Sequence, residues 1–211
     1  MAMNIALNVA VSENLIAKNP CKELSSDDKP KQRQGEREYL TMEELKILID
    51  TPCDQTEQLT KNAFLFSCFT GLRYIDIEQL KWKNIVKIDD DNYQIQLNQQ
   101  KTKNLVVIPL ADNAIRWLPD FNGNKDDHVF DIDNYYNLQL RLKRIIQRTG
   151  LTKKITFHVG RHTYATLLLY YGADLYTVSK LLGHKSVKTT QIYAKVMDET
   201  KRVAVNLIPN I

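Results

Sequence analysis

The stretch HVGRHTYAT at residues 158–166, with LLGHKSVKTTQIYAKV at residues 181–196, carries most of the information in this 211-residue chain. It presents, in order, His158, Arg161, His184 and Tyr193. An arginine can hold phosphate oxygens through two parallel N–H bonds, and a tyrosine hydroxyl can form a covalent intermediate. These residue types predict cleavage of a phosphodiester bond by a tyrosine, without a metal ion or another cofactor.

The same stretch and its surroundings decide the fold class. Helices are predicted at residues 158–171 and 175–182, since a glycine follows each, and a further one at 187–196. Outside the stretch, helices are predicted at residues 41–49, 58–70, 75–82, 111–118, 135–149 and 199–207. Short β-rich runs lie at residues 84–88, 93–97 and 104–109. The fold is therefore predicted to be mainly α with a small three-stranded antiparallel sheet (α+β).

Two helix boundaries rest on particular residues. Thr41 and Glu44 form the pattern of a capping box, which predicts a helix start. Gly71 is predicted to end the helix that begins near Gln58.

The N-terminal region is predicted to be separate from the main domain. Residues 4–16 have the apolar spacing of one amphipathic helix, ended by Asn19-Pro20. Residues 25–38 have the composition of an exposed linker. One helix cannot bury its own apolar side, so residues 1–24 are expected to be the end of another domain, and residues 39–211 the main domain.

Composition narrows the class of protein. The chain is 43% hydrophobic and 26% charged, as in globular proteins, and it holds no apolar run of membrane-spanning length. Its three cysteines are far apart, which argues against a disulfide framework. The sequence predicts a cytoplasmic protein without a membrane partner.

The basic charge is concentrated near the C-terminus. The net charge is only +4, yet residues 134–173 contain no Asp or Glu. The basic residues there and just beyond are Arg141, Lys143, Arg144, Arg148, Lys153, Lys154, Arg161, Lys180, Lys185, Lys188 and Lys195. Such a one-sided distribution favours a polyanionic partner, and the alternative is a solvated basic surface.

Five elements in order carry a family resemblance. They are TGLR ending at Arg73 with Asp76 three positions on, KTKNLVVIPL beginning at Lys101, HVGRHTYAT, LLGH, and IYAKV with Tyr193. Over residues 39–196 the chain resembles the catalytic domain of the tyrosine recombinases, the phage-integrase family. The resemblance implies that fold, and it implies that residues 1–24 are the last helix of a truncated core-binding (SAM-like) domain. Ile75 and Gly160 depart from the usual pattern.

The resemblance also implies roles for the site residues. Arg73 and Arg161 would clamp the phosphate, with Asp76 supporting Arg73, and Tyr193 would attack. His158 would accept a proton or bind phosphate, His184 would donate to a phosphate oxygen, and Lys101 would protonate the leaving oxygen. The predicted DNA contacts are Lys103, Lys153, Lys154 and Lys185.

Alternatives stay open at several positions. Lys103 competes with Lys101 for the general-acid role, and a salt bridge to Asp76 could be the main task of Arg73. His158 and His162 have the i, i+4 spacing of a zinc pair, but no glutamate base accompanies them, and we interpret His162 as structural.

The predicted function is that of a site-specific DNA recombinase. The resemblance implies an enzyme that cuts and rejoins double-stranded DNA through a 3′-phosphotyrosyl intermediate, in the integration or excision of a mobile element. It implies a homotetramer on paired DNA sites, with accessory DNA-bending proteins as further candidate partners. The predicted helix at residues 199–207 has Val203, Val205 and Leu207 available for docking on a neighbour. The alternatives are a type IB topoisomerase-like enzyme and a catalytically silent DNA-binding regulator of the same fold.

Overall fold

The computed structural model describes residues 2–25, 37–90, 92–98, 105–121 and 123–196, in two compact units, Met1–Glu36 and Arg37–Ile211. The first unit holds α1 (Ala2–Ser12) and α2 (Pro20–Glu23). The predicted helix at residues 4–16 was too long, because Asn14 takes a left-handed backbone with φ 57°. Pro20 begins α2, where its missing N–H costs nothing, and the Asn19 side chain caps that helix.

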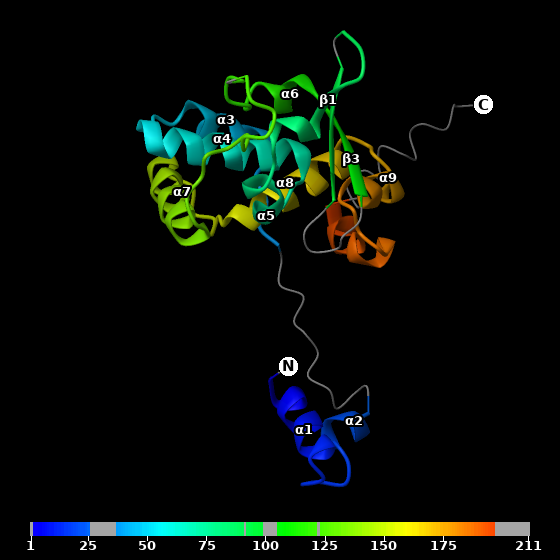
Figure 1. The fold of residues 1–211 in the computed structure, drawn as a ribbon. Helices are drawn as coiled ribbons and strands as arrows, with labels where there is room; N and C mark the ends of the chain where they lie inside the picture. The colour runs from blue at the N-terminus through cyan, green and yellow to red at the C-terminus, as the bar shows by residue number, and fades with distance from the viewer. Residues whose placement is uncertain (1, 26–36, 91, 99–104, 122, 197–211) are drawn as a thin grey trace, which may run out of the picture. The chain divides into compact units, whose positions relative to one another are not determined.

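The second unit is built around α4 (Gln55–Thr70), which packs against three later helices (Figure 1). They are α6 (Asp112–Ile115), α7 (Tyr135–Thr149) and α8 (Phe157–Tyr170). The predicted capping box of Thr41 and Glu44 is confirmed and opens α3 (Met42–Asp50). Helix α4 begins three residues earlier than predicted, because Asp54 and Glu57 form a second capping box.

The sheet has the predicted three antiparallel strands, β1 (Ile85–Lys87), β2 (Tyr93–Asn98) and β3 (Leu105–Leu110), in the order β1-β2-β3. Alternate residues of β3 are buried, so one face of this strand joins the core. Between α4 and the sheet, the predicted helix at residues 75–82 is replaced by α5 (Tyr74–Glu78) and the 3₁₀ turn η1 (Trp82–Asn84).

After the sheet the chain is helical. It forms α6 (Asp112–Ile115), shorter than predicted, then α7 (Tyr135–Thr149), α8 (Phe157–Tyr170) and α9 (Leu175–Leu181), close to the predicted bounds. The main correction concerns residues 187–196, which form two 3₁₀ segments, η2 (Val187–Thr189) and η3 (Gln191–Val196), instead of one α-helix. Short i to i−3 bonds hold them, from Thr190 N to Val187 O and from Tyr193 N to Thr190 O. The helix predicted at residues 199–207 lies outside the described residues.

Two buried clusters hold the second unit together. The larger joins α3, α4, α7, the first turn of α8 and the sheet, and it includes Phe64, Phe66 and Phe157. The smaller lies between α8, α9 and η3 and includes Leu182 and Tyr193. The structure confirms a mainly helical fold with a small three-stranded antiparallel sheet. No helix within the described ranges is both long and apolar enough to cross a membrane.

Gly71 at the end of α4 gives a stability prediction. Its φ is +70°, and an added Cβ would lie 2.5 Å from Tyr164 Cδ1 and 2.9 Å from Leu182 Cδ2. Gly150, with φ +75° and nothing within 4 Å of such a Cβ, is the matched control. We expect Gly150→Ala to lower the free energy of unfolding by about 1–2 kcal/mol, from backbone strain. Gly71→Ala is expected to lose a further ~1–3 kcal/mol from the clash. Equal losses in urea titrations would contradict this packing.

Candidate active site

Arg161 lies at the centre of the candidate site, on α8, with 2% of its surface exposed. Its Nη1 donates to Gly71 O at 2.7 Å and its Nη2 donates to Leu182 O at 2.6 Å. These carbonyls lie at the C-terminal ends of α4 and α9, where backbone dipoles favour a cation. The two bonds use two of the five guanidinium N–H groups, which leaves donors for an anion.

Helix α8 can hold Arg161 there because it lies close to α4. A Cβ on Gly160 would be 2.8 Å from Ser67 Oγ and 3.3 Å from Phe64 O. The glycine that departs from the family pattern therefore permits the close contact of the two helices.

Arg73 is the N-cap residue of α5, two positions after Gly71. Its Nη1 lies 3.7 Å from Asp76 Oδ2, and these side chains are 15% and 0% exposed. The predicted pairing of Arg73 with Asp76 is present, so a buried carboxylate orients a guanidinium that solvent still reaches. Burial and the nearby charge of Arg73 lower the pKa of Arg161 to about 10, so Arg161 keeps its charge at pH 7.

Tyr193 is buried on η3, and its Oη lies 2.6 Å from Nδ1 of His162 on α8. On its other side, His162 Nε2 lies 3.4 Å from Nη1 of Arg37. The sequence interpretation gave His162 no role beyond structure and did not consider Arg37. The signal for His162 was its i, i+4 spacing to His158, and nothing in the local sequence marks Arg37.

His158 is exposed, one turn before His162, and the two rings meet edge to face with centroids 4.5 Å apart. In the described part of the chain, no set of three His, Cys, Asp or Glu side chains could hold a metal ion.

His184 is half-buried directly after Gly183, and its Nδ1 lies 2.8 Å from Thr190 Oγ1. Burial, followed by the charges of Arg161 and Arg73, lowers the pKa of His184 to about 4. The imidazole is therefore neutral at pH 7.

Burial and three arginine charges act on the phenol of Tyr193. Burial raises the pKa of Tyr193 above its ordinary value, and the charges of Arg161, Arg37 and Arg73 offset only part of this rise. These arginines come from distant parts of the sequence, and the fold brings their charges within electrostatic reach of one oxygen.

The depressed pKa of His184 predicts how stability depends on pH. Below pH ~6.5 the unfolded chain binds a proton at this histidine that the folded chain does not bind. The free energy of unfolding should therefore fall as the pH is lowered from ~6.5 towards 4, by less than the limit of about 1.4 kcal/mol per pH unit for one group. Urea titrations of wild type and His184→Gln should show a weaker pH dependence in the variant. Parallel curves would contradict the assignment.

The predicted DNA-contacting lysines lie in different surroundings. Lys153 Nζ lies 2.6 Å from Glu44 Oε2 and donates to Tyr39 O at 2.9 Å, so it joins α3 to the loop before α8. Lys154 and Lys185 are exposed, and Lys101 and Lys103 lie outside the described residues.

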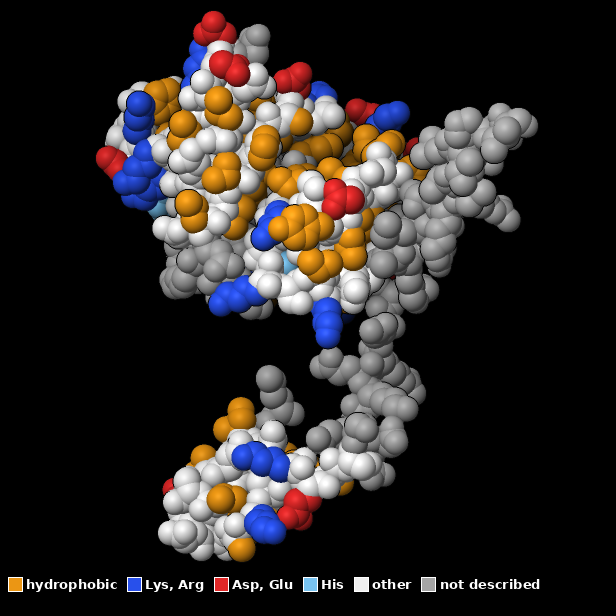
Figure 2. All heavy atoms as spheres, turned by 90° about the vertical axis from the view of Figure 1, so that its right-hand side faces the viewer, with side chains coloured by type: hydrophobic (Ala, Val, Ile, Leu, Met, Phe, Trp, Pro, Cys, Tyr) orange, Lys and Arg blue, Asp and Glu red, His pale blue; other side chains and the backbone are white. Residues whose placement is uncertain are grey.

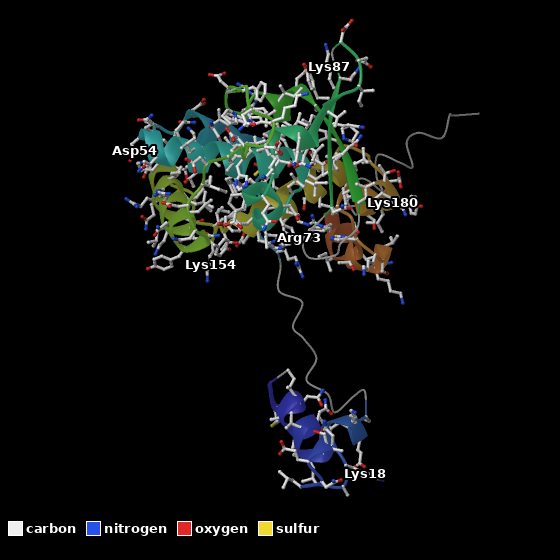
Figure 3. All side chains as sticks on the ribbon, in the orientation of Figure 1. Lys18, Asp54, Arg73, Lys87, Lys154 and Lys180 are labelled. Atoms are coloured by element: carbon white, nitrogen blue, oxygen red, sulfur yellow. The ribbon has the colours of Figure 1, made fainter. Side chains whose placement is uncertain are left out.

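Figures 2 and 3 show where some of the basic side chains lie. Figure 2 shows Lys and Arg side chains at the lower edge of the Arg37–Ile211 unit and also on its left and upper sides. In Figure 3, Arg73 and Lys154 lie on the lower side of this unit, whereas Lys87 lies near the tip of the β1-β2 hairpin.

Comparison with known proteins finds relatives over most of the chain. The chain is 34% identical over 214 aligned residues to the tyrosine recombinase XerC of Caldanaerobacter subterraneus subsp. tengcongensis, covering 92% of this chain and 57% of that protein. It is 30% identical over 209 residues to XerC of Chlamydia trachomatis serovar L2, covering 91% and 64%. The chain thus spans less than two thirds of the length of either relative.

Solved structures share the fold. The catalytic domain of bacteriophage HP1 integrase superposes with a TM-score of 0.61 at 23% identity, covering 82% of this chain and 96% of that one. The Tn1549 transposon integrase, in complex with circular intermediate DNA, superposes with a TM-score of 0.66 at 18% identity, covering 90% and 71%. A family model described as the phage integrase family matches residues 38–200. The chain belongs to the phage integrase family, whose tyrosine recombinases it resembles in fold and in sequence.

Proposed function

We propose that this chain cuts and rejoins DNA strands by transesterification, with the oxygen of Tyr193 becoming joined to a 3′ phosphate. The observation that carries the proposal is the buried phenol of Tyr193 in the combined field of Arg161 and Arg73. A phenol is a weak nucleophile at neutral pH, and cations that favour its ionised form make it more reactive.

In the proposed step, Arg73 and Arg161 hold the nonbridging phosphate oxygens and offset the charge that grows on them. The Thr190 hydroxyl can donate to His184 Nδ1, which leaves Nε2–H to donate to the same phosphate.

The bond changes balance without a cofactor. The Tyr193 oxygen bonds to phosphorus, the bond from phosphorus to the 5′ oxygen breaks, and His158 takes the phenol proton. Lys101 gives a proton to the 5′ oxygen. The phosphotyrosyl ester keeps the energy of the broken bond, so the reverse reaction rejoins a strand.

The proposed partner is double-stranded DNA, with Lys154 and Lys185 contacting phosphates and residues 1–24 ending a core-binding domain. A homotetramer on paired sites would exchange strands in the integration or excision of a mobile element. In support, XerH recombinase and the Tn1549 integrase have been solved bound to DNA substrates.

A second candidate is a recombinase of the Xer kind, favoured by the 34% identity to a XerC protein. The two candidates differ in the DNA that they act on, not in the chemistry.

A covalent-trapping experiment tests the proposal. The protein is incubated in EDTA with duplexes made from genomic DNA of its source, each with a nick in one strand. When the protein cuts close to the nick, the short 5′ fragment diffuses away, so the strand cannot be rejoined. We expect a protein–DNA adduct that survives denaturing electrophoresis. Sequencing the trapped DNA would separate the candidates, because the ends of a mobile element support the first. Binding without any adduct would support the silent regulator and contradict the proposal.

The general acid gives a separate prediction. Lys101→Ala should cleave ordinary DNA poorly, by about 10²-fold, because the 5′ oxygen then leaves without a proton. It should recover on DNA whose 5′ bridging oxygen is replaced by sulfur, since a thiolate leaves unprotonated. Lys103→Ala is the matched control, and recovery in that variant alone would transfer the role to Lys103.

A further inference from the structure

Three side chains form a line from Arg37 through His162 to Tyr193. Arg37 Nη1 lies 3.4 Å from His162 Nε2, and His162 Nδ1 lies 2.6 Å from Tyr193 Oη. His162 is 7% exposed and Tyr193 is 5% exposed, so the contact between them is shielded from water. The proposed function uses Tyr193 but gives Arg37 and His162 no task.

The line of contacts determines which ring nitrogen of His162 carries the proton. Burial, with the charges of His158, Arg37 and Arg161 around the ring, lowers the pKa of His162 to about 3. The ring is therefore neutral at pH 7 and has a single N–H. A guanidinium can only donate, so Nε2 must accept from Arg37, and the proton lies on Nδ1. Nδ1 then donates to the phenol oxygen.

We propose that His162 donates an Nδ1–H hydrogen bond to the oxygen of Tyr193, which fixes and activates this nucleophile, and that Arg37 is the positioning residue that selects the required tautomer. The proposal rests on the proposed function for the role of Tyr193 as nucleophile. A hydrogen bond is stronger to an ionised oxygen than to a neutral one, so this contact favours the phenoxide and opposes the effect of burial.

The proposal also limits the path of the phenol proton. Nδ1 already carries a hydrogen and points at the phenol oxygen, so His162 cannot accept the proton. As the bond from oxygen to phosphorus forms and the bond to the 5′ oxygen breaks, the phenol proton leaves to His158 and the 5′ oxygen receives one from the general acid. His162 keeps its own proton throughout and stabilises the oxygen by donation.

The tautomer can be measured on the whole chain without DNA. Nitrogen NMR of ¹⁵N-histidine-labelled protein at pH 7 distinguishes a protonated from an unprotonated ring nitrogen, and His162→Gln assigns the signals. We expect Nδ1 of His162 to be protonated and its signal to move in Tyr193→Phe, which removes the acceptor. In Arg37→Gln the amide can donate or accept, so a mixture of tautomers is expected. A proton on Nε2 in the wild type would overturn the proposal.

A matched pair of variants tests the effect on the nucleophile. His162→Leu has a side chain of similar size but lacks the Nδ1–H donor. In His162→Asn, the side-chain amide can place an N–H near the position of Nδ1. We expect His162→Leu to slow adduct formation about tenfold at saturating DNA, and to move the rising limb of the rate against pH to higher pH by about one unit. His162→Asn should stay within about threefold of wild type. Equal rates and equal pH profiles for the two variants would overturn the proposal.

Two controls keep the outcomes apart. Thermal unfolding shows whether each variant is folded at the assay temperature. The tautomer of the wild type is measured on the unchanged protein, and His162→Gln serves only to assign its signals. If the wild type forms no adduct, the proposed function is contradicted. If His162→Leu forms the adduct at the wild-type rate, only this inference is contradicted.

Discussion

Tyr193→Phe is expected to abolish the covalent protein–DNA adduct, down to the background of a denaturing gel. The change removes one oxygen, and the proposed reaction joins that oxygen to phosphorus, so no slower route through the same residue remains. The measurement is the shifted band formed with a nicked duplex in EDTA.

Folding and DNA binding provide the controls for this variant. The lost hydrogen bond to His162 should lower the free energy of unfolding by only about 1 kcal/mol. DNA affinity in a native gel should stay close to that of wild type. Tyr164→Phe on α8 is a matched control that should still form the adduct, and an undiminished adduct in Tyr193→Phe would contradict the assignment.

Arg161→Lys is expected to slow adduct formation by about 10²- to 10³-fold, with a much smaller loss of DNA affinity. The lysine keeps a positive charge but loses the planar fork that donates to Gly71 O and Leu182 O and that we propose also holds the phosphate. Bonds that tighten as charge grows in the transition state affect the rate more than the binding. Single-turnover rates at saturating DNA measure the effect.

Arg148→Lys is the matched control for this substitution. Arg148 lies on α7 and pairs with Glu57 of α4, and it is not one of the arginines that act on the pKa of Tyr193. The free energy of unfolding of Arg148→Lys should fall only by the small amount expected for a surface ion pair, and its cleavage rate should equal that of wild type. Equal losses of rate and affinity in Arg161→Lys would mean that Arg161 only positions DNA.

The long helices were predictable because their signals are local. Helix α7 has the predicted bounds, since apolar periodicity runs along it and Gly150 ends it with a left-handed φ of 75°. The capping box at Thr41 is equally local. Residues 187–196 were predicted wrongly because their short 3₁₀ bonds, and the contact of Thr190 with His184, depend on packing beyond that segment.

The arrangement of the site was only partly predictable. The motifs mark Arg73, Arg161, His184 and Tyr193, but they do not say that Arg161 is held by two helix ends. The contact of His162 with Tyr193 joins positions 31 residues apart, and that of Arg37 with His162 joins positions 125 apart. Such contacts depend on how α8 packs, and here Gly160 allows it to lie against Ser67 of α4.

Identification of the DNA-linked residue tests the central claim most directly. The trapped adduct is digested with a protease and a nuclease, and the peptide that carries the remaining nucleotide is sequenced by mass spectrometry. The account predicts a single modified peptide, with the nucleotide on the oxygen of Tyr193. A nucleotide on any other of the ten tyrosines, or on a serine, would contradict it.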